Sequence, residues 1–351
     1  MRTERKQKES AGGELSLQGL CRREEGNGEK AEGPPNAVLP FAEVQIEGRF
    51  EGKGVLPPFR GATLRGGFGY HLKQTVCHRK QSTCQDCIVR TTCAYSCIFE
   101  GIPPQDRQIM RLYPYVPQPF TLLVNSEDPV QIKPGDLFSF GMRLFGRALE
   151  LFPYIAYSFI EMGKEGLGKD RIPFQITRIV QPSFGVEIYH EQVACLHKVQ
   201  TEYPQNLLPV CKRIRVDFVT PVRLRINGRE PSTLRFEDLI RAIVRRFSIL
   251  TYFYGTPTEN LSVDYSAAAA VTSVCSQTKP IEFRRYSGRQ KRPVEMSGLI
   301  GSAIYEGNLE PFLPWLSIAR IIGVGKAASF GFGRIQITPL QEDKHDAERT
   351  D

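Results

Sequence analysis

The sequence predicts an α+β protein built from two ferredoxin-like units in tandem. Stretches of alternating apolar residues, typical of strands, flank stretches with apolar residues four apart, typical of helices, and they follow the order β-α-β-β-α-β twice. The length of 351 residues is sufficient for two domains with separate cores. A cluster of cysteines interrupts the first unit and predicts a metal-binding insertion there.

The predicted domain boundaries follow changes in composition. The first and last segments are rich in charged residues and poor in aromatic and β-branched ones, so we expect disordered tails. The expected parts are a tail at 1–36, an N-terminal domain at 37–200 with a cysteine-rich insertion at 77–105, a C-terminal domain at 210–340 with a glycine-rich loop at 323–333, and an acidic tail at 341–351.

The first half opens with a clear strand at 41–50, where Val44, Ile46 and Phe50 share one face. A helix is expected at 62–77, because apolar residues recur there every four positions. Further strands are expected at 119–125, 137–145 and 174–180, with a second helix at 147–162 in which Pro153 marks a kink or a late start.

The second half repeats this order. Alternation over 213–226 predicts a bent strand, and the spacing of apolar residues over 236–253 predicts the clearest helix of the chain. The remaining elements are expected as strands at 281–287 and 294–304, a helix at 309–322 and a last strand at 332–338.

The charge of the expected folded part favours a polyanionic partner. Residues 37–340 hold 37 Lys and Arg against 26 Asp and Glu. No apolar run approaches the roughly 18 residues that a membrane helix needs, and the N-terminus has no apolar signal region. We therefore expect a cytoplasmic protein that binds nucleic acid and has no membrane partner.

Four cysteines lie within fourteen residues, with the spacing Cys84-x₂-Cys87-x₅-Cys93-x₃-Cys97. Four thiolates can hold one tetrahedral Zn²⁺ ion, and they can equally hold an iron–sulfur cluster. The alternative is a set of reduced thiols without metal. We expect a structural zinc that stabilises the insertion, with the iron–sulfur cluster as the second choice.

A dense basic stretch with a tyrosine in it is the second candidate site. Guanidinium groups bind phosphates and stack on bases, as tyrosine does, so the stretch favours RNA or single-stranded nucleic acid over an ordinary solvated strand edge. Its candidate RNA-binding residues are Arg284, Arg285, Tyr286, Arg289, Lys291 and Arg292.

The glycine-rich loop is the third candidate site. Glycine permits a positive φ and a close approach of the backbone to a ligand, and consecutive N–H groups of such a turn suit an anion. A nucleotide loop would follow a strand and open a helix, whereas this one follows a helix and opens a strand, so a nucleotide cofactor is not expected. The candidate RNA-binding residues of the loop are Gly323, Gly325, Lys326, Ser329, Gly331 and Gly333.

Histidine is scarce in the chain, with five residues. His71 lies on the first predicted helix beside Tyr70 and Lys73, where a lone histidine is more often a packed residue than a catalyst. No carboxylate constellation and no Ser/His/Asp spacing indicates another hydrolytic chemistry.

Several stretches together resemble the CRISPR-associated endoribonucleases of the RAMP superfamily, which process precursor CRISPR RNA. The glycine-rich signature of that family, two Gly-hydrophobic-Gly triplets separated by five residues that include a Lys or Arg, is met at every position. The resemblance rests on Leu234–Leu239, Arg285–Gln290 and Gly323–Gly333 in the second half, and on Phe59–Gly69, the cysteine insertion and Gly141–Ala148 in the first.

The resemblance implies a metal-independent cut within each CRISPR repeat. The 2′-OH of the RNA attacks the adjacent phosphate and leaves a 2′,3′-cyclic phosphate and a 5′-OH. Several family members carry a catalytic histidine and a lysine on the first helix, which makes His71 the candidate base, with Lys73 and Tyr70 as helpers. No cofactor is implied for catalysis.

Two alternatives remain open. The same fold can bind CRISPR RNA as a non-catalytic subunit of an effector complex, because a fold does not fix an activity. A metal-stabilised nucleic-acid-binding protein outside CRISPR biology is the other alternative.

Overall fold

The computed structural model describes residues 39–78, 83–101, 116–125, 128–192, 196–226, 228–256, 262–287 and 291–341. The predicted tail at 1–36 and nearly all of the tail at 341–351 lie outside these residues. Within the described part of the chain, no helix is long and apolar enough to cross a membrane.

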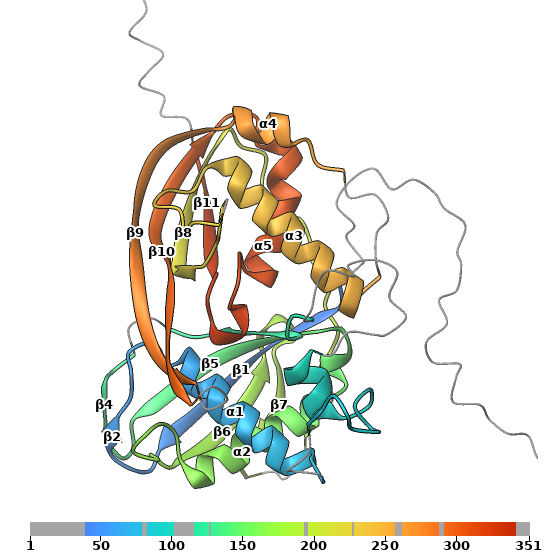
Figure 1. Ribbon diagram of the computed structural model, residues 1–351, viewed down its shortest axis with the longest axis vertical. Coiled ribbons are helices and arrows are strands. Elements are labelled where there is room, and N and C mark those ends of the chain that lie inside the picture. The colour runs from blue at the N-terminus through green and yellow to red at the C-terminus, as the bar shows by residue number, and fades with distance from the viewer. Residues whose placement is uncertain are drawn as a thin grey trace, which may run out of the picture. The chain divides into compact units, whose positions relative to one another are not determined.

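The first half forms a five-stranded antiparallel sheet with the order β3-β5-β1-β6-β7 (Figure 1). The first four of these strands have the ferredoxin-like order, since β1 and β5 occupy the centre. The strands are β1 (Phe41–Phe50), β3 (Phe120–Leu123), β5 (Leu137–Phe145), β6 (Phe174–Gln181) and β7 (Val186–His190), and the helices are α1 (Gly61–Val76) and α2 (Phe152–Glu165).

The second half forms a four-stranded antiparallel sheet with the order β11-β8-β10-β9, again the ferredoxin-like order. The tandem fold predicted from the sequence is therefore confirmed. The elements are β8 (Arg213–Val222), β9 (Thr272–Ser287), β10 (Arg292–Glu306), β11 (Ile335–Leu340), α3 (Phe236–Tyr254), α4 (Tyr265–Ala270) and α5 (Leu313–Ile322).

Several short elements complete the fold. They are a two-stranded sheet of β2 (Gly54–Val55) and β4 (Gln131–Ile132), a π-helical turn η2 (Ser96–Glu100), and the 3₁₀ turns η3 (Gly146–Leu149), η4 (Pro182–Phe184), η5 (Glu310–Phe312) and η6 (Ala328–Phe330). The 3₁₀ turn η3 precedes α2, whose first turn contains Pro153, so this proline marks a late start and not a kink.

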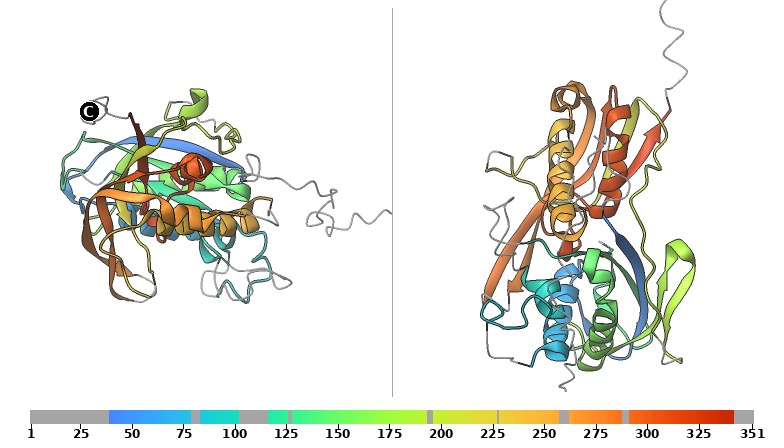
Figure 2. Two further views of the ribbon diagram at one scale, coloured as in Figure 1. Left: turned by 90° about the horizontal axis from the view of Figure 1, so that it is seen from above. Right: turned by 90° about the vertical axis from the view of Figure 1, so that its right-hand side faces the viewer.

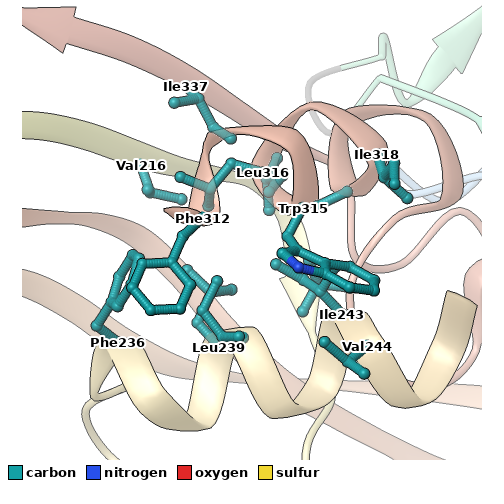
Figure 3. Packing of buried hydrophobic residues seen from close by; sticks show 14 of the residues in the cluster. Val216, Phe236, Leu239, Ile243, Val244, Phe312, Trp315, Leu316, Ile318 and Ile337 are labelled. Atoms are coloured by element: carbon teal, nitrogen blue, oxygen red, sulfur yellow. The ribbon is translucent and has the colours of Figure 1, made fainter. Parts of the chain in front are cut away.

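In each half the two long helices lie side by side, α1 with α2 and α3 with α5 (Figure 2). Figure 3 shows the core of the second half, where Phe236, Leu239 and Ile243 of α3 face Phe312 and Trp315. These residues of α3 recur at the three- and four-residue spacing on which the helix prediction depended.

Several elements of the second half differ from the sequence prediction, among them α5 and β11, which begin at Leu313 and Ile335. The bent strand expected to reach 226 ends at Val222. Strand β9 begins at Thr272, nine residues earlier than expected, because the sheet edge over 272–280 is exposed and polar and shows no apolar alternation. Helix α4 was not predicted; its N-cap is Asp264, whose carboxylate accepts from two backbone N–H groups.

Two arginines hold the C-terminal end of α5, from which the glycine-rich loop starts. Arg246 of α3 donates from Nε to the Ile322 carbonyl at 2.6 Å and from Nη2 to Thr121 Oγ1 at 3.3 Å. Arg143 of β5 donates to the carbonyl oxygens of Ile321, at 2.9 Å, and of Arg320. Cations are favourable at a helix C-terminus, so these contacts fix the exit of α5 against α3 and the first sheet.

Candidate functional site

The glycine-rich loop connects α5 to β11 through positive-φ residues. The φ angles are 75° at Gly323, 79° at Gly325, 86° at Gly331 and 80° at Gly333, and Ala327 adopts 67°. The special backbone conformation that the glycine spacing predicts is therefore present.

The structure gives three of these glycines an intramolecular reason. A Cβ on Gly325 would lie 2.4 Å from the Arg223 carbonyl oxygen, one on Gly333 would lie 2.1 Å from that of Val324, and one on Gly331 would lie 2.6 Å from Val124. The close approach expected toward a ligand is thus also an approach of the loop to its own chain.

Most backbone donors of the loop are also occupied. The N–H groups of Val324 and Lys326 donate to Gly333 and Arg223, and that of Gly333 donates to Pro221. Three more, those of residues 330–332, donate within the loop. An anion would therefore contact mainly side chains here. Lys326, a predicted RNA-binding residue, is exposed.

The loop sits directly on the start of α1, in the other half of the chain. A Cβ on Gly61 would lie 1.9 Å from the Phe330 carbonyl oxygen. Arg65 Nε donates to Ser329 Oγ at 3.2 Å, and this hydroxyl donates to Gln118 Oε1 at 3.0 Å. The predicted residue Ser329 thus joins the two halves through Arg65.

Two arginines meet at the ring of Phe330, and we call them the arginine pair. The Cζ atom of Arg65 lies 4.2 Å from the ring centroid and that of Arg285 lies 4.7 Å from it. Arg65 comes from α1 and Arg285 from β9. The site therefore draws on both halves and on the loop between α5 and β11.

Burial and like charge both act on the arginine pair. Burial, followed by the charge of Arg285, lowers the pKa of Arg65 to about 10. Burial and then the charge of Arg223 lower the pKa of Arg285. The Nε atom of Arg285 is buried and has no hydrogen-bond partner among the described residues.

The other predicted residues of the basic stretch lie along the β9–β10 hairpin. The side chain of Arg284 is 81% exposed and 3.4 Å from Glu295 Oε1. Lys291 and Arg292 are exposed at the start of β10. Tyr286 lies in β9, and its side chain, like the whole of Arg289, lies outside the described residues.

The three candidate catalytic residues lie on α1 but do not converge. His71 is 5% exposed, and its Nε2 lies 4.0 Å from Glu165 Oε2 of α2. Tyr70 is 54% exposed, and its ring contacts the His71 ring edge-on with 5.0 Å between centroids. Lys73 instead lies over the ring of Tyr95 at 5.5 Å, because two residues span about 200° of a helix.

Burial lowers the pKa of His71, against an opposing effect of the Glu165 and Glu161 carboxylates. The imidazole is therefore neutral at neutral pH, the form in which it can accept a proton. Arg65 lies six residues earlier on α1 and faces about 120° away, so the structure places His71 and the arginine pair on different sides of this helix.

The cysteine insertion presents all four predicted ligands as free thiols. Cys93 and Cys97 lie one helical turn apart, and burial raises the pKa of the Cys84 and Cys97 thiols. No three His, Cys, Asp or Glu side chains of the described residues are grouped closely enough for a metal. The four cysteine side chains do not fit a tetrahedral ion, and the structural metal stays a prediction.

The sequence analysis missed Arg65, Gln118 and Phe330 as members of this site. Arg65 lies inside the segment Phe59–Gly69 that carries the family resemblance, four residues after Gly61. That i, i+4 spacing places Arg65 one helical turn beyond the residue on which the loop rests. The long-range contacts of Gln118 and Phe330 leave no local signal.

Comparison with known proteins agrees with this architecture. Residues 216–335 match the family model of the CRISPR-associated endoribonuclease Cas6, and residues 39–202 match a model described as an N-terminal domain. An uncharacterized protein of Archaeoglobus fulgidus is 28% identical over 292 residues, which cover 80% of this chain and 92% of that protein.

Two solved structures share the fold at low sequence identity. Cas6 of Thermus thermophilus aligns with a TM-score of 0.51 and 12% identity over 87% of this chain and 100% of the other. A chain of the partial Cas6-RT-Cas1–Cas2 complex aligns with a TM-score of 0.54 and 10% identity over 88% of this chain and 48% of that chain.

The tandem fold and the glycine-rich loop make this chain similar to the CRISPR-associated RAMP-like proteins. Its C-terminal half, over residues 216–335, matches the family model of the Cas6 endoribonuclease.

Proposed function

We propose that this protein is an endoribonuclease that cuts precursor CRISPR RNA within its repeats and so produces guide RNAs. The match of residues 216–335 to the Cas6 family carries this proposal, since the matched span contains the whole glycine-rich loop. The basic β9–β10 hairpin and the arginine pair supply the positive surface that an RNA backbone requires.

The proposed reaction uses the RNA's own 2′-OH as nucleophile. The oxygen attacks the adjacent phosphorus, the bond from phosphorus to the 5′ oxygen breaks, and the leaving 5′ oxygen takes up a proton from water. The products carry a 2′,3′-cyclic phosphate and a 5′-OH. The neutral His71 accepts the 2′-OH proton, and the imidazolium formed is stabilised by the nearby Glu165 carboxylate. The exposed Tyr70, in contact with the His71 ring, orients the reacting groups.

Lys73 has a less direct role in this proposal, because it lies over Tyr95 on another side of α1. We assign it to the charge around the bound backbone and not to the proton transfer. The cysteine insertion is assigned a structural role, and the reaction proceeds without a metal ion.

The first test of the proposal is cleavage of a CRISPR repeat RNA from the source organism in the presence of EDTA. We expect one cut per repeat, with 5′-OH ends that polynucleotide kinase labels directly. Loss of cleavage in EDTA with recovery on added Mg²⁺, or products with 5′-phosphate ends, would contradict the metal-independent reaction. Tight binding without any cut would instead identify a non-catalytic RNA-binding subunit.

A further inference from the structure

The arginine pair has the features of a preorganised anion-binding site. We propose that Arg65 and Arg285 together bind one backbone phosphate of the RNA beside Phe330, and that this contact fixes the register of the strand between the two halves. The proposal depends on the proposed function for the identity of the ligand, an RNA backbone, but not on cleavage.

The arginine pair lacks a carboxylate partner among the described residues. Neither guanidinium of the pair has an acid within ion-pair distance in the described ranges, although Glu100 acts on Arg65 from further away. Other arginines of the chain do have such partners. Examples are Arg49 with Glu191, Arg143 with Glu43, Arg178 with Glu47, Arg235 with Asp238 and Arg241 with Glu237.

The arginine pair is electrostatically unfavourable without a ligand. Burial and the charge of Arg285 lower the pKa of the partly buried Arg65, and a buried donor without a partner, such as Arg285 Nε, is unfavourable. The neighbouring Arg223, paired with Glu230 at 3.8 Å, adds further positive charge to Arg285. A phosphate would offset this repulsion and would accept hydrogen bonds from both forks.

The side chains of the arginine pair are held in place without a ligand. Arg65 is fixed by its bond to Ser329, which is fixed in turn by Gln118. Both guanidinium groups also lie on the ring of Phe330, which limits their rotation. A binding group fixed in advance loses little side-chain entropy when the ligand binds.

The position of the pair favours a polymer over a small anion. Arg285 belongs to the hairpin strand that also carries the exposed Arg284, and Lys326 of the loop is exposed as well. One inorganic phosphate needs only the pair, whereas a nucleic-acid backbone offers successive phosphates to all of these cations.

The test uses repeat RNA with a 2′-deoxy nucleotide at the cut, so that binding is measured without cleavage. A series of such RNAs carries a single neutral methylphosphonate linkage at each position in turn. We expect one linkage at which neutralisation weakens binding to wild-type protein about 10-fold and has little further effect on Arg65→Met or Arg285→Met protein. Independent, additive losses at every linkage would overturn the proposal.

Salt dependence and thermal stability supply the second readout. In either variant the slope of log K against log salt should fall by about 0.7, the contribution of one single-strand phosphate, while Tm stays equal or rises because a like charge is gone. Arg241→Met is the matched control, since it removes an exposed arginine paired with Glu237, and its slope should not change. Unchanged slopes in both pair variants, or weaker binding only in proportion to a lowered Tm, would contradict the proposal.

Inorganic phosphate separates the two sources of the ligand chemistry. At millimolar concentration it should raise the Tm of wild-type protein by less than the deoxy repeat RNA does. An equal or larger rise with phosphate would assign the pair to a small anion. A protein that binds but does not cut would refute the proposed function and leave the phosphate site intact.

Discussion

Replacing His71 with alanine is expected to slow cleavage of the repeat RNA by about 10²- to 10⁴-fold, the range typical of losing a general base. Binding of the deoxy repeat RNA should remain within about two-fold of wild type, because the neutral His71 side chain supplies no positive charge to the RNA phosphates. The measurement is a single-turnover cleavage rate beside a binding titration with the uncleavable RNA.

The matched control is His190→Ala, which removes a histidine from β7. Its rate should equal the wild-type rate. His71→Gln keeps most of the buried volume and should lose the same rate as His71→Ala, which separates proton transfer from packing. An unchanged rate in both His71 variants would remove this residue from the active site.

The pH dependence of the rate follows from the environment of His71. Because burial lowers the pKa of this imidazole, the acidic limb of the rate profile should have its midpoint below 6.5, the ordinary value. The same shift means that the folded state binds fewer protons than the unfolded state, so His71 contributes a loss of stability as pH falls below 6.5. This loss should be absent in His71→Gln.

Replacing Gly61 with alanine is expected to destabilise the protein by about 3 kcal/mol. The new Cβ would lie 1.9 Å from the Phe330 carbonyl oxygen, a backbone atom that cannot rotate away. The start of α1 and the glycine-rich loop would have to separate. Equilibrium denaturation measures the loss, and affinity for repeat RNA should fall with it because Phe330 positions the arginine pair.

Gly66→Ala is the control for this prediction, since Gly66 lies on the same helix and a Cβ there meets no atom within 4 Å. The alanine should raise stability by up to about 1 kcal/mol through helix propensity. If Gly61→Ala proved as stable as Gly66→Ala, the close seating of the loop on α1 would be refuted.

The fold could be predicted wherever one face of a helix or strand is buried, because apolar residues then recur at a regular spacing in the sequence. Strand β1 occupies the predicted range 41–50, because its alternate side chains enter the core. The beginning of β9 was missed because an exposed edge strand needs no apolar face. Helix α3 ends one residue beyond its predicted range, since its core face runs along its whole length.

The site was harder to predict because its parts come together only through tertiary contacts. The glycine spacing announced an unusual backbone, yet the structure shows that Gly325 and Gly333 are required by neighbouring carbonyl groups of the protein. Arg285 was a predicted RNA-binding residue. Arg65 was not predicted, because its contact with Ser329 of the glycine-rich loop exists only in the folded protein. The common helix of His71 and Lys73 and their divergent directions were predictable, because two residues span about 200° of a helix, whereas their partners Glu165 and Tyr95 were not.

The proposed nucleophile of the cut is the RNA's own 2′-OH. The most direct measurement replaces this one hydroxyl with hydrogen at the nucleotide preceding the scissile phosphate and follows cleavage of the repeat. We expect the deoxy RNA to bind as tightly as the natural RNA and not to be cut at that linkage. Continued cleavage at the same linkage would contradict it.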